Sequence, residues 1–379
     1  MTFESVDQLQ KALTEKVFQY AKDSKKATGR ALGTIVEIIT FYLIRVWGLN
    51  DSISIEKRIP EYGNPDITHN VEYSLHPILN KYDIKVKNDG HSITANEILK
   101  ALNDITNLSN FEKTNNYLLT KDDILRNACR IALADNSYLV ASIFKITHKN
   151  VFISIVEQNI KAYAVLECKR VGVEEGTKKG PQTIEKAKQG AYVARTISSL
   201  QKVRLPTGEA YGVIYEGNRV IRSRPYRELL SEVIESNDKE LLRDFVLTVG
   251  VVSNHGNWFT SEDHNKELKV LAQSYDWLIF LTDDGITQFT NDLILNPAPN
   301  YSTVKRAFLV SYSQSKKQNQ FTKVQMNMEA HLALINYFSN NLSQIEKWFN
   351  IISPASGSTS QLKSEIHTLQ MKNWGDILK

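Results

Sequence analysis

The stretch Ala164-Val165-Leu166-Glu167-Cys168-Lys169-Arg170 places an acid and a lysine at the end of an apolar run. Such a run is typical of a strand inside a sheet, and side chains alternate between the two faces of a strand. We therefore expect Glu167 and Lys169 to share one face and Cys168 to be a small core residue on the other. Burying a carboxylate and an ammonium costs free energy unless the two are paired or used, so this pair indicates a functional site.

Hydrolysis of a phosphodiester is one reaction that uses this pair. The carboxylate helps to hold a divalent cation, while the lysine positions water and stabilises the charge that develops on phosphorus. Mg²⁺ prefers oxygen ligands and keeps several waters, so one or two further carboxylates complete a site. The first candidate is Asp66, which follows the turn residue Pro65 and precedes a β-like run.

Pro65-Asp66 followed by Glu167-Cys168-Lys169 resembles the motif of the PD-(D/E)XK nuclease superfamily, most closely its type II restriction endonucleases. Glu37, on the helix expected before the first strand, looks like the acid that many members carry there. Gln189 and Tyr192 are similar to a Gln/Tyr signature of some branches, although the spacing in those branches is usually one residue longer. The matching segments span roughly residues 28–70 and 150–200.

The resemblance implies a restriction-endonuclease-like mixed β-sheet flanked by helices and a homodimer that cleaves double-stranded DNA at a specific site with Mg²⁺. It implies that Asp66 and Glu167 bind the cation, that Lys169 orients the water and that Glu37 assists. One departure is the gap of 100 residues between Asp66 and Glu167, because the family's gap is commonly a few tens. Either an insertion lengthens it, or the second acid is Asp135 or Glu157, with Glu157 ranked second after Asp66.

Strands and helices alternate along the chain, which predicts an α/β or α+β fold around a mixed sheet. Four regions are expected: N-terminal helices and first strands (1–79), a mainly helical insertion (80–150), the nuclease core with the Glu-x-Lys strand (151–300), and a basic, helical C-terminal region (301–379). Helices are expected at 1–23, 28–47, 182–202 and 326–350. Strands are expected at 52–59, 66–79, 151–156, 162–168, 210–215, 245–252 and 277–281.

Basic residues gather in three stretches, although the net charge is only +4 from 46 Lys and Arg against 42 Asp and Glu. Phosphate backbones attract such clusters, and Arg, Asn and Gln can read base edges. The expected DNA contacts are Lys178, Lys179, Arg222, Arg224, Lys316 and Lys317. The chain carries neither of the glycine-rich motifs that bind phosphates of nucleotides, so no nucleotide cofactor is expected.

The N-terminal residues show no basic and apolar pattern of a secretory signal, and two cysteines are too few for a disulfide framework. The apolar stretch Leu32–Leu49 contains Glu37 and Arg45, so no membrane span is expected. These features predict a cytoplasmic protein. Two alternative functions stay open: a non-catalytic, sequence-specific DNA-binding protein, and a nonspecific or repair nuclease of the same fold.

Overall fold

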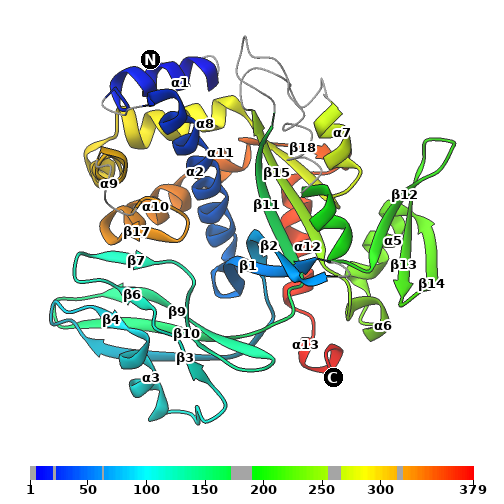
Figure 1. Ribbon diagram of the computed structural model, residues 1–379, viewed down its shortest axis with the longest axis horizontal. Helices are drawn as coiled ribbons and strands as arrows, with labels where there is room; N and C mark the ends of the chain where they lie inside the picture. The colour runs from blue at the N-terminus through cyan, green and yellow to red at the C-terminus, as the bar shows by residue number, and fades with distance from the viewer. Residues whose placement is uncertain (1–5, 20–22, 62–63, 172–189, 255–265, 314–318) are drawn as a thin grey trace.

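A six-stranded mixed sheet lies at the centre of the computed structural model, which describes residues 6–19, 23–61, 64–171, 190–254, 266–313 and 319–379 (Figure 1). The strand order is β1-β2-β11-β15-β16-β18. Strands β15 and β16 run parallel to β11, and the other neighbouring pairs are antiparallel. The bounds are β1 (Ile53–Glu61), β2 (Asn64–Leu75), β11 (Ala164–Val171), β15 (Leu247–Asn254), β16 (Trp277–Leu281) and β18 (Phe349–Ser353).

The inner strands β15 and β16 are buried at every residue, which explains why they are nearly continuous apolar runs. In β16, Trp277, Ile279 and Leu281 pack in the large core with α2 and α12, whereas Leu278 and Phe280 pack on the other face with α7. The same alternation in β11 puts Glu167 and Lys169 on the face opposite to Cys168, as the sequence predicts.

Helices flank this sheet, so the α+β class expected from the sequence is confirmed. The N-terminal helices are α1 (Val6–Lys16) and α2 (Ser24–Ile44), and α2 continues through the π-helical turn Arg45–Leu49 and the 3₁₀ turn Asn50–Ser52. Later helices are α5 (Tyr226–Glu235), α6 (Lys239–Leu242), α7 (Lys266–Ala272), α8 (Asp283–Thr290), α9 (Ser302–Ser313), α10 (Met328–Asn340), α11 (Leu342–Glu346), α12 (Thr359–Gln370) and α13 (Trp374–Ile377). Two short turns, the π-helical Asn291–Leu295 and the 3₁₀ turn Pro299–Tyr301, join α8 to α9.

The predicted helical insertion is wrong, because the region between β2 and β11 is mostly β-structure. It forms a five-stranded antiparallel sheet of order β3-β10-β9-β8-β5, which lies below the central sheet in Figure 1. Its strands are β3 (Ile78–Lys87), β5 (Glu112–Lys113), β8 (Cys129–Leu133), β9 (Ser137–Ile146) and β10 (Asn150–Asn159). Within residues 80–150 the α-helix that the structure contains is α3 (Ala95–Asn103), which packs on this sheet.

Two smaller sheets complete the described β-structure. One is a meander of β12 (Leu200–Arg204), β13 (Ala210–Glu216) and β14 (Arg219–Pro225), which projects at the right of Figure 1. The other joins β4 (Ile93–Thr94), β6 (Tyr117–Leu119) and β7 (Ile124–Arg126) to β17 (Gln325–Asn327), so the C-terminal part of the chain pairs with the insertion.

Several predicted elements are confirmed, and several have different bounds. The strand expected at 66–79 covers most of β2 and the first residues of β3, which belong to different sheets. Of the helix expected at 182–202, the described part is helical at residues 190–196. Strand β12 follows from Leu200. The helical tail expected at 326–350 divides into α10 and α11 and ends before β18, a strand that the sequence analysis did not expect. The strands expected at 151–156 and 210–215 exist as β10 and β13, yet neither belongs to the central sheet.

By length and composition, the segment Ser24–Ser52 could cross a membrane. The shorter stretch Leu32–Leu49, considered in the sequence analysis, did not indicate this. In the fold, 67% of its most apolar window is buried inside the protein. Helix α2 therefore has the burial of a core helix, and its apolar residues face the central sheet.

Candidate nuclease centre

Strand β11 presents its acid and its lysine away from the core that contains α2. Cys168 is buried in that core, where its Sγ lies 3.5 Å from Thr40 Oγ1, so its expected role as a small core residue is confirmed. On the neighbouring strand β15, Gly250 lies in register with Glu167, and the ring of Tyr275 packs over this glycine. The carboxyl group of Glu167 is thereby enclosed and only 1% exposed.

A second acid meets Glu167 where strands β2 and β11 separate. Their ladder ends at the pair Leu166 and Tyr73. Beyond it, the backbone N–H of Glu72 donates to Glu167 Oε2 at 3.2 Å, and the backbone N–H of Cys168 donates to Glu72 Oε2 at 3.2 Å. The two carboxylates take over hydrogen bonds that backbone carbonyls would otherwise make, and this fixes both acids at the opening of the sheet.

Lys169 lies between the buried acid and solvent. Its Nζ is 2.6 Å from Glu167 Oε1, and its side chain is 25% exposed whereas that of Glu167 is 1% exposed. This ion pair holds the ammonium in place. A cation is thus held next to two acids, at a position that solvent reaches.

A second lysine binds three acids from three different elements. Lys323, which lies just before β17 and is 8% exposed, has its Nζ 3.1 Å from Glu37 Oε2, 3.4 Å from Glu56 Oε1 and 3.9 Å from Glu72 Oε1. Glu56 stands at φ +50 within β1, a backbone conformation that non-glycine residues rarely adopt and that is frequent at functional sites. Glu37 therefore joins the centre through Lys323.

The crowding of these acids shifts their proton affinities. The pKa of Glu167 is raised to about 8, first by burial and then by the hydrogen bond and charge of Glu72, against the opposing effect of Lys169. Burial alone also raises the pKa of Glu72, but the hydrogen bond with Glu167 and the charges of Lys169 and Lys323 bring it below its ordinary value. Such opposed shifts in two adjacent carboxyl groups are typical of functional sites.

The lysines respond in the opposite sense. Burial lowers the pKa of Lys169, yet the charges of Glu167 and Glu72 outweigh burial and leave the pKa above its ordinary value. The same balance, with Glu37 and Glu72 as the acids, raises the pKa of Lys323. Both lysines stay charged at neutral pH, so the centre combines buried acids with two fixed cations.

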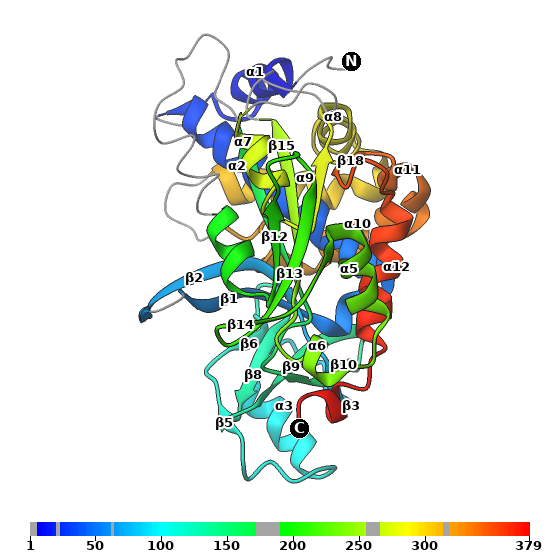
Figure 2. The same cartoon turned by 90° about the vertical axis from the view of Figure 1, so that its right-hand side faces the viewer.

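The other acids expected from the sequence lie away from this centre. Asp66 belongs to β2 but precedes Glu72 by six residues, about 20 Å along a strand, on the β1–β2 hairpin that extends outward in Figure 2. Asp135 occupies the turn between β8 and β9, and Glu157 accepts hydrogen bonds within the five-stranded sheet. The acid that the structure places next to Glu167 is thus Glu72. It is none of the three acids that the sequence analysis considered.

The structure describes only some of the residues that the sequence analysis expects to contact DNA. Arg222 and Arg224, on β14, both form ion pairs with Glu232 of α5, so one carboxylate serves two guanidinium groups and a net positive charge remains. Tyr192 lies on the helical residues 190–196 and is 42% exposed. The remaining expected residues lie outside the described residues: Lys178, Lys179, Gln189, Lys316 and Lys317.

Sequence reasoning missed three members of the centre. Glu72 stands between Val71 and Tyr73 in a β-like run, which is the same signal that identified Glu167. Glu56 alternates with apolar residues in β1 and therefore resembles the solvent face of a half-buried strand. Lys323 lies in a polar stretch without any local pattern, and only tertiary packing reveals it.

The residues present suit a hard divalent cation. Two carboxylates share one opening, and burial together with the hydrogen bond and charge of Glu72 raises the pKa of Glu167, a cost that a bound cation relieves. Two carboxylates suffice for Mg²⁺, which keeps waters and accepts substrate oxygens, although no group of three or more His, Cys, Asp and Glu in the described ranges is arranged to hold a metal. Comparison with protein-family models, curated proteins and solved structures gave no match to this chain.

Proposed function

We propose that this chain is a Mg²⁺-dependent deoxyribonuclease that cleaves double-stranded DNA at specific sites, as type II restriction endonucleases do. The observation that carries the proposal is the pair of carboxylates, Glu72 and Glu167, beside Lys169, each of which accepts a hydrogen bond from a backbone N–H of the other's strand. A mixed sheet flanked by helices, with the Glu-x-Lys sequence on a central strand, also agrees with the core that the resemblance implies. By the same resemblance we expect a homodimer, and the cysteine count and N-terminal pattern of the sequence favour a cytoplasmic location.

Each residue of the centre has a defined task in this proposal. Glu72 and Glu167 would hold the cation, which supplies charge neutralisation at the scissile phosphate when bound. Lys169 Nζ donates hydrogen bonds at the solvent side of Glu167, where it orients the attacking water and opposes charge on phosphate oxygens. Lys323 keeps Glu37, Glu56 and Glu72 together and compensates their charge.

Plasmid digestion with and without Mg²⁺ tests the proposal. We expect discrete fragments from the wild type with Mg²⁺, and a loss of more than about a hundredfold in rate for Glu72→Gln, Glu167→Gln and Lys169→Ala, since each removes charge at the reacting phosphate. Glu157→Gln is the matched control, because this acid lies in the five-stranded sheet, and it should cleave at the wild-type rate.

Other results would redirect the assignment. A smear in place of discrete fragments indicates a nonspecific or repair nuclease. DNA binding without any cleavage favours the non-catalytic DNA-binding protein, in which the contact between Lys169 and Glu167 is a structural salt bridge. Cleavage that survives Glu72→Gln but not Asp66→Asn would return the second cation ligand to Asp66.

A further inference from the structure

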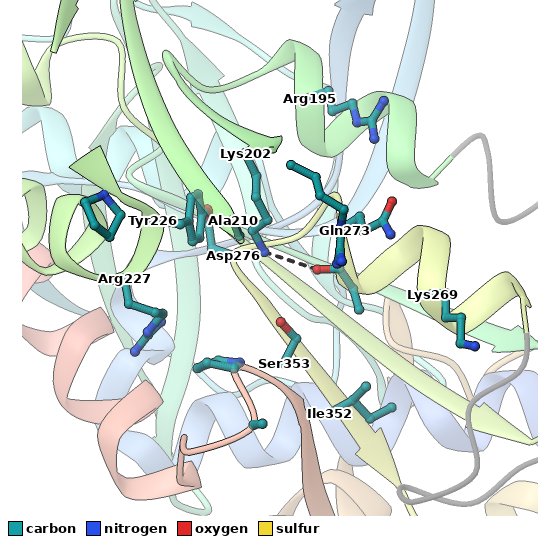
Figure 3. Close-up of a pocket in the computed structure, with 15 residues that line it drawn as sticks. Arg195, Lys202, Ala210, Tyr226, Arg227, Lys269, Gln273, Asp276, Ile352 and Ser353 are labelled. Atoms are coloured by element: carbon teal, nitrogen blue, oxygen red, sulfur yellow. Dashed lines mark hydrogen bonds between the residues drawn. The ribbon is translucent and has the colours of Figure 1, made fainter. Parts of the chain in front are cut away.

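A cavity of the described structure lies outside the carboxylate centre. It has a volume of about 780 Å³ and opens between β12, the first turn of α5, α7 and the connection from β18 to α12 (Figure 3). Its volume falls within the range of ordinary small-molecule sites and is far larger than one phosphate group needs. The size therefore admits a ligand of nucleotide dimensions or a short piece of a nucleic-acid strand.

Positive charge dominates the walls of this cavity. The cationic lining residues are Arg195, Lys202, Arg204, Arg227 and Lys269. In Figure 3, Arg195 and Lys269 stand on one side and Arg227 on the other, with Lys202 between them. The acid among the lining residues is Asp276, and its carboxylate is already occupied by the hydroxyl of Tyr226 and by the N–H and hydroxyl of Thr248.

Neutral groups, and not acids, hold the central lysine. Lys202 Nζ donates to the carbonyl oxygens of Ala272 at 3.1 Å and Tyr275 at 2.6 Å, and it lies 4.4 Å from the centroid of the Tyr226 ring. These contacts fix the position of the ammonium without cancelling its charge. Because carbonyl oxygens accept two of its protons, a third proton stays available for an anion.

The cations at the rim are also poorly compensated. Arg227 has an acidic partner in Glu365 at 3.4 Å and lies over the Trp277 ring. Arg195 and Lys269 are exposed, and no described carboxylate lies within ion-pair distance of either. A concave surface with several uncompensated cations attracts an anion of multiple charge, because each added contact is charge-assisted.

We infer that this cavity binds a ligand that carries two or more phosphate groups. Successive phosphates of a nucleic-acid strand and the polyphosphate of a free nucleotide both have this chemistry. The inference is separate from the proposed cleavage, since none of the lining residues belongs to the carboxylate centre. The two sites are nevertheless neighbours through Tyr275, whose carbonyl binds Lys202 and whose ring covers the glycine opposite Glu167.

Binding of two probes to the full chain in EDTA tests the inference: a labelled short DNA duplex, followed by fluorescence anisotropy, and ATP, followed by calorimetry. The double variant Arg195→Gln/Lys269→Gln removes two exposed charges and should leave the melting temperature unchanged. Lys100→Gln/Lys347→Gln is the matched control, because it removes two exposed charges from α3 and from the residue after α11. We expect the cavity variant, and not the control, to bind roughly tenfold more weakly.

The probe that responds identifies the source of the phosphates. Weaker duplex binding, with a shallower salt dependence, assigns the cavity to nucleic acid, and weaker ATP binding assigns it to a nucleotide. Binding of neither probe, or equal binding by the cavity variant and the wild type, overturns the inference. Glu167→Gln keeps the cavity intact, so a failure of cleavage and a failure of this binding can be distinguished.

Discussion

At the scale of single residues, Glu167 carries a carboxyl group buried in the fold, and its ionisation there costs free energy. Its side chain is 1% exposed, and its pKa is raised to about 8, first by burial and then by Glu72. The unfolded chain releases this proton near the ordinary value for Glu, so between these two values the folded state binds more protons. The contribution of Glu167 to the free energy of unfolding of the metal-free protein is therefore fully present below this interval. This contribution is lost as the pH rises through about 8.

The variant Glu167→Gln should remove this loss, since an amide is neutral at every pH. We expect the free energy of unfolding of the variant, relative to the wild type, to rise by about 2 kcal/mol between pH 5 and pH 8. Chemical unfolding in EDTA at several pH values measures this difference, and Glu157→Gln serves as the control with no such rise. A difference that does not change with pH would show that Glu167 is already ionised in the fold.

The same residue scale shows how far the sequence could identify the site. Glu167 and Lys169 were predicted because a strand of period two puts them on one face, and their contact at 2.6 Å agrees with that prediction. Asp66 ranks first from the sequence because a turn proline is a visible local feature, whereas Glu72 was missed because its value depends on which strand pairs with β11. Strand pairing is a long-range property that one sequence does not display.

At the scale of elements, strand β15 shows how closely the centre is packed from behind. A Cβ atom at Gly250 would lie 2.7 Å from Leu278 Cδ1 and 2.9 Å from Tyr275 Cδ2. Both neighbours are buried, so neither can move aside without disturbing the packing over Glu167. Glycine is needed at this position because of its volume, since its backbone φ lies outside the left-handed region.

We therefore expect Gly250→Ala to lower the free energy of unfolding by about 1–3 kcal/mol, as overpacking of a core does. Urea unfolding measures the change. The control is Gly33→Ala on α2, where an added Cβ meets nothing within 4 Å and alanine favours the helix by about 1 kcal/mol. If the Gly250 variant is as stable as the wild type, the packing of Tyr275 over the centre is looser than described.

Elements of the central sheet were easier to predict than those of the insertion. Strands buried on both faces are continuous apolar runs, so β11, β15 and β16 stand out in the sequence. Strands of the five-stranded sheet have a solvent face, and β3 reads Ile-Leu-Asn-Lys-Tyr-Asp-Ile-Lys-Val-Lys with many polar residues. Its alternation was visible, but the polar and Asn-rich composition was interpreted as helical, and this produced the wrong insertion.

At the scale of the whole molecule, His76 joins the two large sheets. The chain leaves the central sheet at this residue, which is fully buried, and returns beyond Asn159. His76 Nδ1 is 2.9 Å from the carbonyl oxygen of Asn159, so it donates, and Nε2 accepts from Ser74 Oγ at 2.7 Å. This pattern requires the neutral ring with its proton on Nδ1, and burial holds the pKa well below the ordinary value for His.

A depressed pKa stabilises the fold above the unfolded value of about 6.5, and this stabilisation is lost as the pH falls. We expect acidification from pH 7 to pH 5 to destabilise the wild type by about 2 kcal/mol through His76. His76→Gln should lose less stability than the wild type between pH 7 and pH 5, whatever the stability of the variant at pH 8. Thermal unfolding at each pH measures the two losses. His331, buried against Tyr42 with a lowered pKa, contributes to the slope that remains in the variant. Equal slopes in variant and wild type would contradict the prediction.

The position of Lys323 has a consequence for biosynthesis. Glu37, Glu56 and Glu72 leave the ribosome early, whereas the ammonium that neutralises them follows some 250 residues after Glu72. A nascent chain that ends before Lys323 has a cluster of acids without its counter-charge, and it also lacks β17, the strand that pairs with the insertion. The proposed catalytic centre is therefore completed only when most of the polypeptide has been translated.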